Sequence, residues 1–456
     1  MKIEIKVDED SEGDEGVEIR LAKWSARSSS SRRTMLKMPH AGVSNLFLSL
    51  LLLLASWFPG ILEAAPRITL GIEVLASAHP EMVRGKRLAL LVAPTSIDQN
   101  LEHSVDRLAR AATVEVIFTG DPYFRQTLKS TASQTGLVDA LTGARVRELS
   151  DPLKRPTPAD LGKAELIVID VQDIGIRYFN YVTLLAQFLE LAREANVPVL
   201  VLDRPNPINA RTVSGPILEI SFRSRFGVYP IPLVYGMTFG ELALFFNKVF
   251  GLGAKLTVIG MEGYIRDMGF RHSGLHWVPP SDHLAEADTP LYYAITGFLG
   301  EMGVFSTGVG STRPFHYILA PWINGEVLAR RLSMLNLAGV RFMPASIKPF
   351  YGLFQQKRTP GIEIVVDDAR LYDPVLIGVA ILQNLYTLYP ESIPLRNQAV
   401  SEGIDTLLGG KAVREALLKG ETPANIAAGW QNALKSFLKQ REPFLIYSDG
   451  RSQEAE

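Results

Sequence analysis

The 456-residue chain contains no cysteine. This absence excludes a thiol nucleophile, disulfide bonds, thiolate metal sites and a lipoprotein anchor cysteine. The chain also has no marked excess of either charge, because 48 acidic and 47 basic residues leave a net charge of −1. No long basic face is interleaved with aromatic residues, so nucleic acid is not expected as a partner. This charge balance favours a small or neutral ligand.

Several catalytic and nucleotide motifs are absent as well. No Gly-x-Gly-x-x-Gly follows the first expected strand, and no Gly-x-x-x-x-Gly-Lys-Ser/Thr occurs in the chain. The glycine-rich stretch 303–310 lacks a strand-to-helix context and is interpreted as structural. No serine-centred nucleophile elbow is found, which disfavours a serine hydrolase. His272, His276 and His283 match no zinc spacing, so neither a metal nor another cofactor is expected.

Only one long apolar run is present, at residues 46–58, and it is shorter than the about 20 residues of a membrane span. A basic, serine-rich stretch precedes it, and small residues at 64–65 offer a cleavage point. We therefore expect residues 1–65 to be a leader and signal sequence of an exported, periplasmic or secreted protein. Residues 31–37 resemble a twin-arginine signal, and an ordinary basic signal peptide is the alternative. If uncleaved, this segment would be the protein's only contact with a membrane.

From Gly71 onward, short apolar strands alternate with helical stretches, which is typical of an α/β domain with a mainly parallel sheet. Strands are expected at residues 87–92, 114–118, 166–171, 197–202 and 255–259. After about residue 269 the chain changes to loops rich in proline, histidine and aromatics, followed by helices. We predict a Rossmann-like domain at 66–268 and a smaller α+β domain at 269–456. Their interface is a favoured place for a ligand cleft.

Polar clusters follow several of the expected strands. The clearest is at residues 166–181, where a β-branched apolar run ends in carboxylates, an amide, a glycine and an arginine. Loops that follow parallel strands gather at one edge of the sheet, where ligands bind. The residues that could converge there are Asp121, Asp173, Arg177, Asp203, Arg204 and Asn206. The alternative is structural: the aspartates cap helices or pair within their own loops, Asp173 with Arg177 and Asp203 with Arg204.

Five motifs follow one another along the chain. They are Asp170-x-Gln172-Asp173-x-Gly175-x-Arg177-Tyr178, Leu202-Asp203-Arg204-Pro205-Asn206-Pro207, Gly236-Met237-Thr238-x-Gly240-Glu241-Leu242, Trp277-x-Pro279-Pro280-Ser281 and Thr312-Arg313-Pro314-Phe315. In this order they resemble the motifs of the NamZ-type exo-β-N-acetylmuramidases, and the resemblance runs from about Leu70 to Tyr447. It implies an exported bacterial enzyme that removes N-acetylmuramic acid from the non-reducing ends of peptidoglycan fragments. It also implies a Rossmann-like N-terminal domain and a smaller C-terminal domain.

The chain departs from this family at three loops. Where the family typically has Pro-Glu-His-Gly, with the glutamate as presumed catalytic acid, this chain has Gly-Asp121-Pro122-Tyr. The resemblance therefore places the catalytic acid at Asp121, whose side chain is one methylene shorter. Tyr235 replaces the histidine usual before Gly-Met-Thr, and the family's Asn-Met-Pro is replaced around Asp282-His283. These changes predict an altered substrate, an altered mechanism or lost catalysis.

Glycoside hydrolysis requires an acid and either a second carboxylate or a group on the sugar that stabilises the transition state. Asp121 could be the acid, with Asp173 or Asp282 as the second carboxylate or a water-orienting group. The lactyl carboxylate of muramic acid calls for a cation, and Arg177 and Arg313 are the candidates, with a salt bridge in the core as the alternative.

Two functions remain open from the sequence. The first is an active exo-glycosidase whose partners are peptidoglycan fragments or other sugars that contain muramic acid. The second is a catalytically impaired relative that binds glycan or a protein partner in the envelope. The residues predicted to bind substrate are Asp173, Arg177, Tyr178, Arg204, Asn206, Asp282 and Arg313.

Overall fold

The computed structural model describes residues 68–120, 128–130, 137–149 and 155–450. These residues belong to one compact unit, Ala64–Glu456. The expected leader and the predicted catalytic residue Asp121 lie outside the described residues. Within the described ranges, no helix combines the length and the apolar character that crossing a bilayer requires.

The first part of the unit is built on a mixed, mainly parallel sheet with the strand order β10-β7-β6-β1-β2-β5-β4-β3. Its first six strands run parallel, and β4 and β3 are added antiparallel at one end. The strands are β1 (Arg87–Val92), β2 (Thr113–Thr119), β3 (Leu128–Ser130), β4 (Leu137–Asp139), β5 (Arg145–Glu148), β6 (Leu166–Asp170), β7 (Val199–Leu202) and β10 (Leu256–Ile259). The predicted α/β class with a Rossmann-like, mainly parallel sheet is confirmed.

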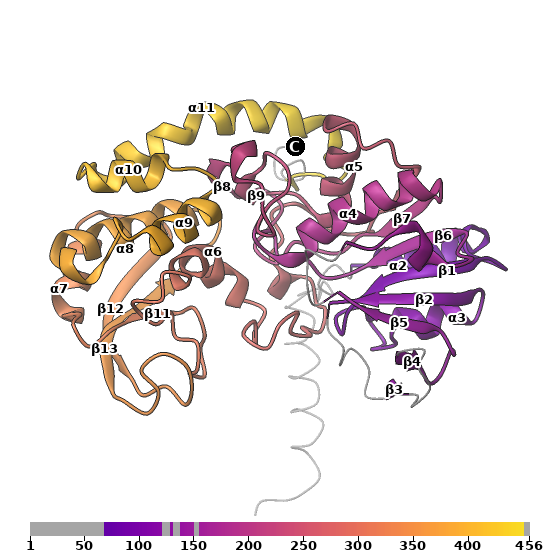
Figure 1. The fold of residues 1–456 in the computed structure, drawn as a ribbon, viewed down its shortest axis with the longest axis horizontal. Helices are drawn as coiled ribbons and strands as arrows, with labels where there is room; N and C mark the ends of the chain where they lie inside the picture. Colours follow the sequence, from indigo (N-terminus) through magenta and orange to yellow (C-terminus); the bar gives the residue numbers. More distant parts are fainter. Residues whose placement is uncertain (1–67, 121–127, 131–136, 150–154, 451–456) are drawn as a thin grey trace, which may run out of the picture. The chain divides into compact units, whose positions relative to one another are not determined.

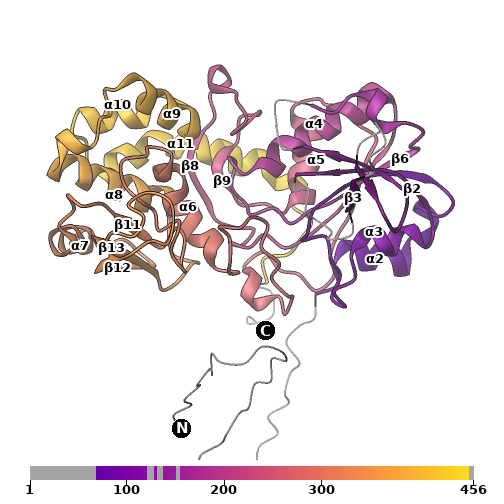
Figure 2. The same cartoon turned by 60° about the horizontal axis from the view of Figure 1, so that its bottom comes forward.

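Helices cover both faces of this sheet because successive side chains of a strand point to opposite faces. Leu88 and Leu90 of β1 pack with α2 (Gly71–Ala78) and α3 (Ser104–Ala109). Ala89 and Leu91 pack instead with α4 (Asn180–Ala195) and α5 (Phe239–Val249). Figure 2 shows these two pairs of helices on opposite sides of the sheet.

The second part of the unit contains a three-stranded antiparallel sheet with the order β11-β13-β12 and a group of helices. Its elements are α6 (Thr289–Gly300), β11 (Tyr317–Leu319), α7 (Gly325–Ser333), β12 (Val340–Ile347), β13 (Thr359–Val366), α8 (Pro374–Leu388), α9 (Gln398–Leu408), α10 (Ala412–Leu418) and α11 (Pro423–Arg441). A two-stranded ribbon of β8 (Val213–Ile217) and β9 (Pro232–Tyr235) precedes it. Short 3₁₀ turns lie at Pro80–Met82, Pro158–Leu161, Ile220–Phe222, Phe270–His272, Pro390–Ser392 and Glu442–Phe444.

The two parts share a continuous apolar core. Ile174, Ile176 and Tyr178, which follow β6 in the first part, belong to the same buried cluster as α6 and α8 of the second part. Burial of that much apolar surface is the main force that holds the two parts together. The domain boundary at residue 268 stays a prediction, because the core crosses it.

The C-terminal residues return to the first part of the unit. Helix α11 runs from the C-terminal helices towards α5 (Figure 1), and the chain then reaches the parallel sheet. The backbone N–H of Ile446 donates to Glu241 Oε1 at 2.8 Å, and the Tyr447 hydroxyl donates to Asp203 Oδ2 at 2.6 Å. Residues of the predicted C-terminal domain thus complete the hydrogen bonding of the N-terminal one.

Candidate functional site

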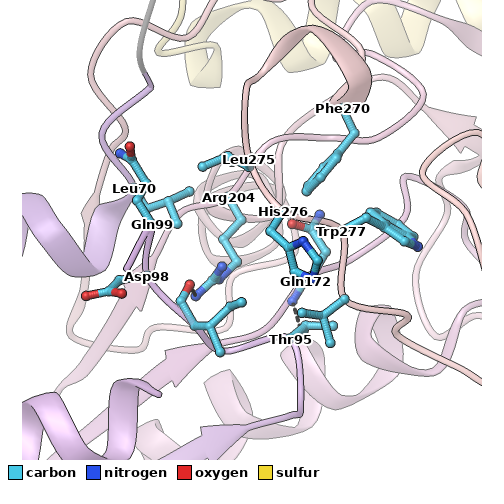
Figure 3. A pocket seen from close by; sticks show the side chains of 12 residues that line it. Leu70, Thr95, Asp98, Gln99, Gln172, Arg204, Phe270, Leu275, His276 and Trp277 are labelled. Atoms are coloured by element: carbon cyan, nitrogen blue, oxygen red, sulfur yellow. Dashed lines mark hydrogen bonds between the residues drawn. The ribbon is translucent and has the colours of Figure 1, made fainter. Parts of the chain in front are cut away.

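The loops that follow β1, β6 and β7 meet at the carboxyl edge of the sheet, as expected for parallel strands. They line a narrow hollow of about 20 Å³, here called the edge hollow. Its lining includes Thr95 after β1, Gln172 after β6 and Arg204 after β7, covered by the loop that carries His276 and Trp277. Figure 3 shows the side chains of Thr95, Gln172, Arg204 and His276 grouped here, with the Trp277 indole to one side.

Arg204, one of the predicted binding residues, lines the edge hollow. It is only 5% exposed, and its guanidinium pairs with the buried Asp170 through two hydrogen bonds, one of them 2.9 Å from Nη2 to Oδ2. Nη2 also donates to the carbonyl of Ile97 at 2.9 Å. The alternative in which the side chains of Asp203 and Arg204 pair is wrong. Asp203 instead accepts from the hydroxyls of Thr238 and Tyr447 and from the backbone N–H groups of Gly240 and Arg204.

Asp173 is buried directly behind this edge. Its Oδ2 accepts from the backbone N–H of Gly175 at 2.7 Å and from the Tyr235 hydroxyl. Its Oδ1 has no hydrogen-bond partner among the described residues, and its alternative salt bridge with Arg177 is not formed. Burial, which outweighs these hydrogen bonds, raises the pKa of Asp173 to about 6. Tyr235 therefore supplies a neutral donor to this carboxyl group.

The raised pKa of Asp173 predicts a pH-dependent stability. The folded protein binds a proton at Asp173 more tightly than the unfolded chain, whose carboxyl has the usual pKa of 3.8. The contribution of Asp173 to the free energy of unfolding is therefore highest below about pH 4 and falls by about 2 to 3 kcal/mol as the pH rises through 6. We expect the Asp173→Asn variant to gain stability relative to wild type over this rise, measured by urea unfolding at several pH values.

The comparison of variant with wild type is necessary because other buried groups titrate in this range. Burial also raises the pKa of Asp203 to about 6, so Asp203 likewise lowers stability as the pH rises. His316 acts in the opposite direction, since burial lowers its pKa to about 4. Asp282 is exposed, so an Asp282→Asn variant is the matched control and should keep the wild-type pH dependence. A parallel curve for Asp173→Asn and wild type would contradict the prediction.

Arg177 is completely buried and bonded to backbone carbonyls. Nη1 donates to Pro216 at 2.9 Å and Ile231 at 2.7 Å, and Nη2 donates to Leu407 at 2.8 Å. Burial lowers the pKa of Arg177 to about 9. These bonds tie the segment after β6 to the ribbon and to α9. The expectation that Arg177 pairs with a substrate carboxylate finds no support in this position.

Tyr178 and Asn206 are likewise buried and hold neighbouring loops. The Tyr178 hydroxyl donates to the carbonyl of Tyr293 at 2.9 Å, and the two rings meet edge to face. Asn206 Nδ2 donates to the carbonyl of Met237 at 2.9 Å, and Oδ1 accepts from the N–H of Ile208 at 3.1 Å. Both side chains thus hold loops in place and do not face a ligand directly.

Gly175 is required by this packing. Its φ of +77° is in the left-handed region, and a Cβ there would lie 2.5 Å from the Asn206 amide. We expect Gly175→Ala to lower the free energy of unfolding by about 2 to 4 kcal/mol, because backbone strain and a clash add. Gly85 has a similar φ of +72° with open space around it, so Gly85→Ala isolates the strain. Equal losses for both variants in denaturant unfolding would disprove the clash.

A second and larger hollow, of about 430 Å³, is lined by residues of the second part of the unit together with Phe179 of the first, and is here called the aromatic cleft. It brings together chain segments next to or within three of the five motifs. Phe179 follows the first motif, Ser281 ends the fourth and Phe315 ends the fifth. Its described lining is Phe179, Ser281, His283, Leu284, Tyr293, Gly297, Gly300, Glu301, Gly303, Phe305, Ser306, Thr307, Val309, Phe315 and Leu353.

This lining is suited to a sugar. Aromatic rings stack on the apolar faces of sugar rings, and hydroxyls such as those of Ser281 and Thr307 can bond to sugar hydroxyls. Sequence reasoning missed Tyr293, Glu301 and Thr307. The glycine-rich stretch 303–310, interpreted as structural, was the available signal, because it forms one wall of the cleft.

The remaining predicted residues lie near this cleft or outside the description. Asp282 is exposed between two residues of the cleft lining, and Arg313 forms a salt bridge with Glu363. Asp121 itself is not described. The preceding residue, Gly120, lies beside Tyr181, since a Cβ on it would be 3.9 Å from that ring. The Tyr181 ring in turn contacts Phe179 of the cleft, with centroids 5.4 Å apart.

Metal binding finds no site in the described part of the chain. No three His, Asp or Glu side chains are grouped there so that they could hold an ion.

Comparison with known proteins assigns the family. The sequence profile described as "Exo-beta-N-acetylmuramidase NamZ, N-terminal" matches residues 88–288, and its C-terminal counterpart matches residues 291–447. The chain belongs to the NamZ family. The "Peptidoglycan beta-N-acetylmuramidase NamZ" of Bacillus subtilis is 33% identical over 385 residues, which cover 84% of this chain and 92% of that protein.

Two solved structures are also similar to this chain. A DUF1343 family protein of Bacteroides fragilis has a TM-score of 0.78 and 31% identity, and the match covers 84% of this chain and 100% of that one. A second DUF1343 protein of the same species, at 24% identity and a TM-score of 0.65, shares the fold over 84% of this chain and 99% of its own. Membership of the NamZ family supports a glycosidase of the peptidoglycan hydrolase type.

Proposed function

We propose that the protein is an exported exo-β-N-acetylmuramidase that releases N-acetylmuramic acid from the non-reducing ends of peptidoglycan fragments. Family membership across both parts of the unit carries this proposal. The aromatic cleft supports it, because aromatic rings and hydroxyls gather there. Small ligands usually bind in concave sites that combine apolar and aromatic walls with a few polar groups.

Asp121 is the acid in this proposal. Its carboxyl group would protonate the leaving glycosidic oxygen, as hydrolysis requires. Among the described residues that line the cleft, Glu301 is the one carboxylate, and it is exposed. Asp173 is buried behind the edge of the sheet. The acetamido group of the substrate is therefore the favoured partner that stabilises the developing positive charge at the anomeric carbon.

A direct assay tests the proposed function. The purified protein should release N-acetylmuramic acid from a chromogenic muramoyl glycoside and from the ends of peptide-free glycan fragments. Binding without any release would favour the second candidate, a glycan-binding relative, which is supported by the presence of Asp121-Pro122 where the family resemblance leads us to expect Glu-His.

Export is proposed from the N-terminal segment alone. The apolar run 46–58 and the basic stretch before it are the features that support it. Cell fractionation combined with N-terminal sequencing of the mature protein would test it. A protein that stays in the cytoplasm with residues 1–65 intact would contradict the proposal.

A further inference from the structure

The loop between β12 and β13, residues 348–358 and here called the basic-aromatic loop, exposes three large apolar side chains in close succession. Phe350 is 62% exposed, Tyr351 49% and Leu353 40%. Single exposed apolar side chains are common on protein surfaces, but a contiguous group of them marks an interaction site. The loop therefore has the composition of a contact surface.

The charges of the same loop are all positive. Lys348, Lys357 and Arg358 are exposed, and the loop contains no aspartate or glutamate. Within the described residues none of the three forms an ion pair, and Arg358 donates to the carbonyl of Ser346 at 3.2 Å. Three exposed cations without acidic partners attract an anionic partner, and this attraction weakens as salt is added.

The basic-aromatic loop is joined to the aromatic cleft. Leu353 belongs to the cleft lining, and the Tyr351 ring meets the ring of His283 in that lining edge to face. The backbone N–H of Phe350 donates to the carbonyl of Gly310 at 2.7 Å. Gly310, whose φ is +91°, has no room for a Cβ beside the Tyr351 carbonyl, so the two backbones pack closely. A ligand that leaves the cleft past Leu353 therefore meets the loop.

The proposed substrate has the chemistry that this loop would recognise. In a peptide-free glycan strand every second sugar is a muramic acid, so lactyl carboxylates repeat along the strand. A cleft of about 430 Å³ is at the lower end of the size range for small-ligand sites, so the sugars that follow the terminal unit would lie outside it. Their apolar faces can stack on exposed aromatic rings, and their carboxylates can pair with lysine and arginine.

We propose that the basic-aromatic loop binds the sugars that follow the cleaved unit in a peptide-free glycan strand. Exposed rings stack on these sugars, and the three cations pair with their lactyl carboxylates. The inference rests on the proposed function for the identity of the strand. It assigns to the protein a preference for long, carboxylate-bearing strands over short fragments. None of the three cations lines the cleft, so their effect is on the longer strand and not on its terminal sugar.

Calorimetric titration with two unreactive ligands tests this role. They are a disaccharide and a hexasaccharide of alternating N-acetylmuramic acid and N-acetylglucosamine, each with muramic acid at the non-reducing end and sulfur in its first glycosidic bond. Wild type should bind the hexasaccharide about five- to thirty-fold more tightly than the disaccharide, as expected for several exposed ion pairs and a stacked ring. Raising salt from about 0.05 M to about 0.5 M should lower this ratio.

Two loop variants separate charge from stacking. The triple variant Lys348→Gln, Lys357→Gln and Arg358→Gln should reduce the ratio to no more than about three and leave the disaccharide affinity unchanged, because only ion pairs outside the cleft are lost. Phe350→Ala should also lower the ratio, but what remains should keep its dependence on salt.

The triple variant Lys419→Gln, Lys435→Gln and Lys439→Gln is the matched control. These lysines are exposed at the end of α10 or on α11, so the same loss of charge away from the loop should leave the ratio at its wild-type value. Equal binding of the two ligands by wild type, binding of neither, or an unchanged ratio in the loop triple variant would each overturn the inference.

Two further outcomes identify what has failed. If the loop triple variant loses binding to phosphatidylglycerol vesicles while the sugar ratio stays unchanged, the loop contacts a membrane and the inference is wrong. The predicted ratios without hydrolysis of the oxygen-linked strand would defeat only the proposed hydrolase activity. Hydrolysis with an unchanged ratio in the loop triple variant would defeat only the role of the loop.

Discussion

The Asp121→Asn variant should hydrolyse a muramoyl glycoside about 10²- to 10⁴-fold more slowly than wild type, which is the usual contribution of a general acid. An amide cannot donate a proton to the leaving oxygen, while its size and shape keep the local packing. The loss should appear in kcat, with little change in the affinity for an unreactive substrate analogue. Steady-state kinetics with calorimetric binding separate the two quantities.

Asp121→Glu is the informative companion to this variant. It gives the carboxyl group the side-chain length of the glutamate that the family resemblance leads us to expect at this position, so we expect it to keep or raise the wild-type rate. A loss in Asp121→Glu as large as that in Asp121→Asn would mean that this loop has been reshaped around the shorter acid. An Asp121→Asn variant that retains its rate would remove Asp121 from the mechanism.

Replacing Arg177 by methionine should lower the free energy of unfolding by about 3 to 5 kcal/mol. Methionine fills a similar volume but has no donor, so the carbonyls of Pro216, Ile231 and Leu407 would be buried without partners. The variant no longer buries a charged guanidinium, and this gain offsets only part of the destabilisation. Denaturant unfolding followed by circular dichroism measures the change.

The Arg84→Met variant is the control for this change. Arg84 is exposed, so its replacement should alter the free energy of unfolding by no more than about 0.5 kcal/mol. Because Leu407 lies in the last turn of α9, we also expect Arg177→Met to loosen α9 from the ribbon, detected as faster amide exchange in residues 398–408. Unchanged stability would contradict the role that the structure gives to Arg177.

The sheet could be predicted from the sequence because its signals are local. An apolar run such as residues 166–170, followed by polar residues, is dictated by burial on both faces of a parallel sheet, and β6 has every residue buried. The alternation of such runs with helices implied the parallel order. The return of residues 441–447 to the sheet had no local signal, because it depends on contacts between residues more than 180 positions apart.

The sequence indicated where polar residues gather, but it did not indicate what each of these residues does. The motif after β6 does lie at the carboxyl edge, but Asp173, Arg177 and Tyr178 are buried and bonded within the protein. A charged residue in a loop carries the same sequence signal whether its partner is a substrate or a distant carbonyl. The partner is chosen only when the chain folds.

The sequence by itself determined the family, the α/β class and the edge of the sheet where polar groups gather, because periodicity and motif order are written in neighbouring residues. Tertiary structure alone decided that Arg204 pairs with Asp170, that Arg177 clamps three carbonyls, and that neutral residues with Glu301 form the cleft wall. These outcomes depend on which side chains share a buried space, and burial changes the energy of each charge.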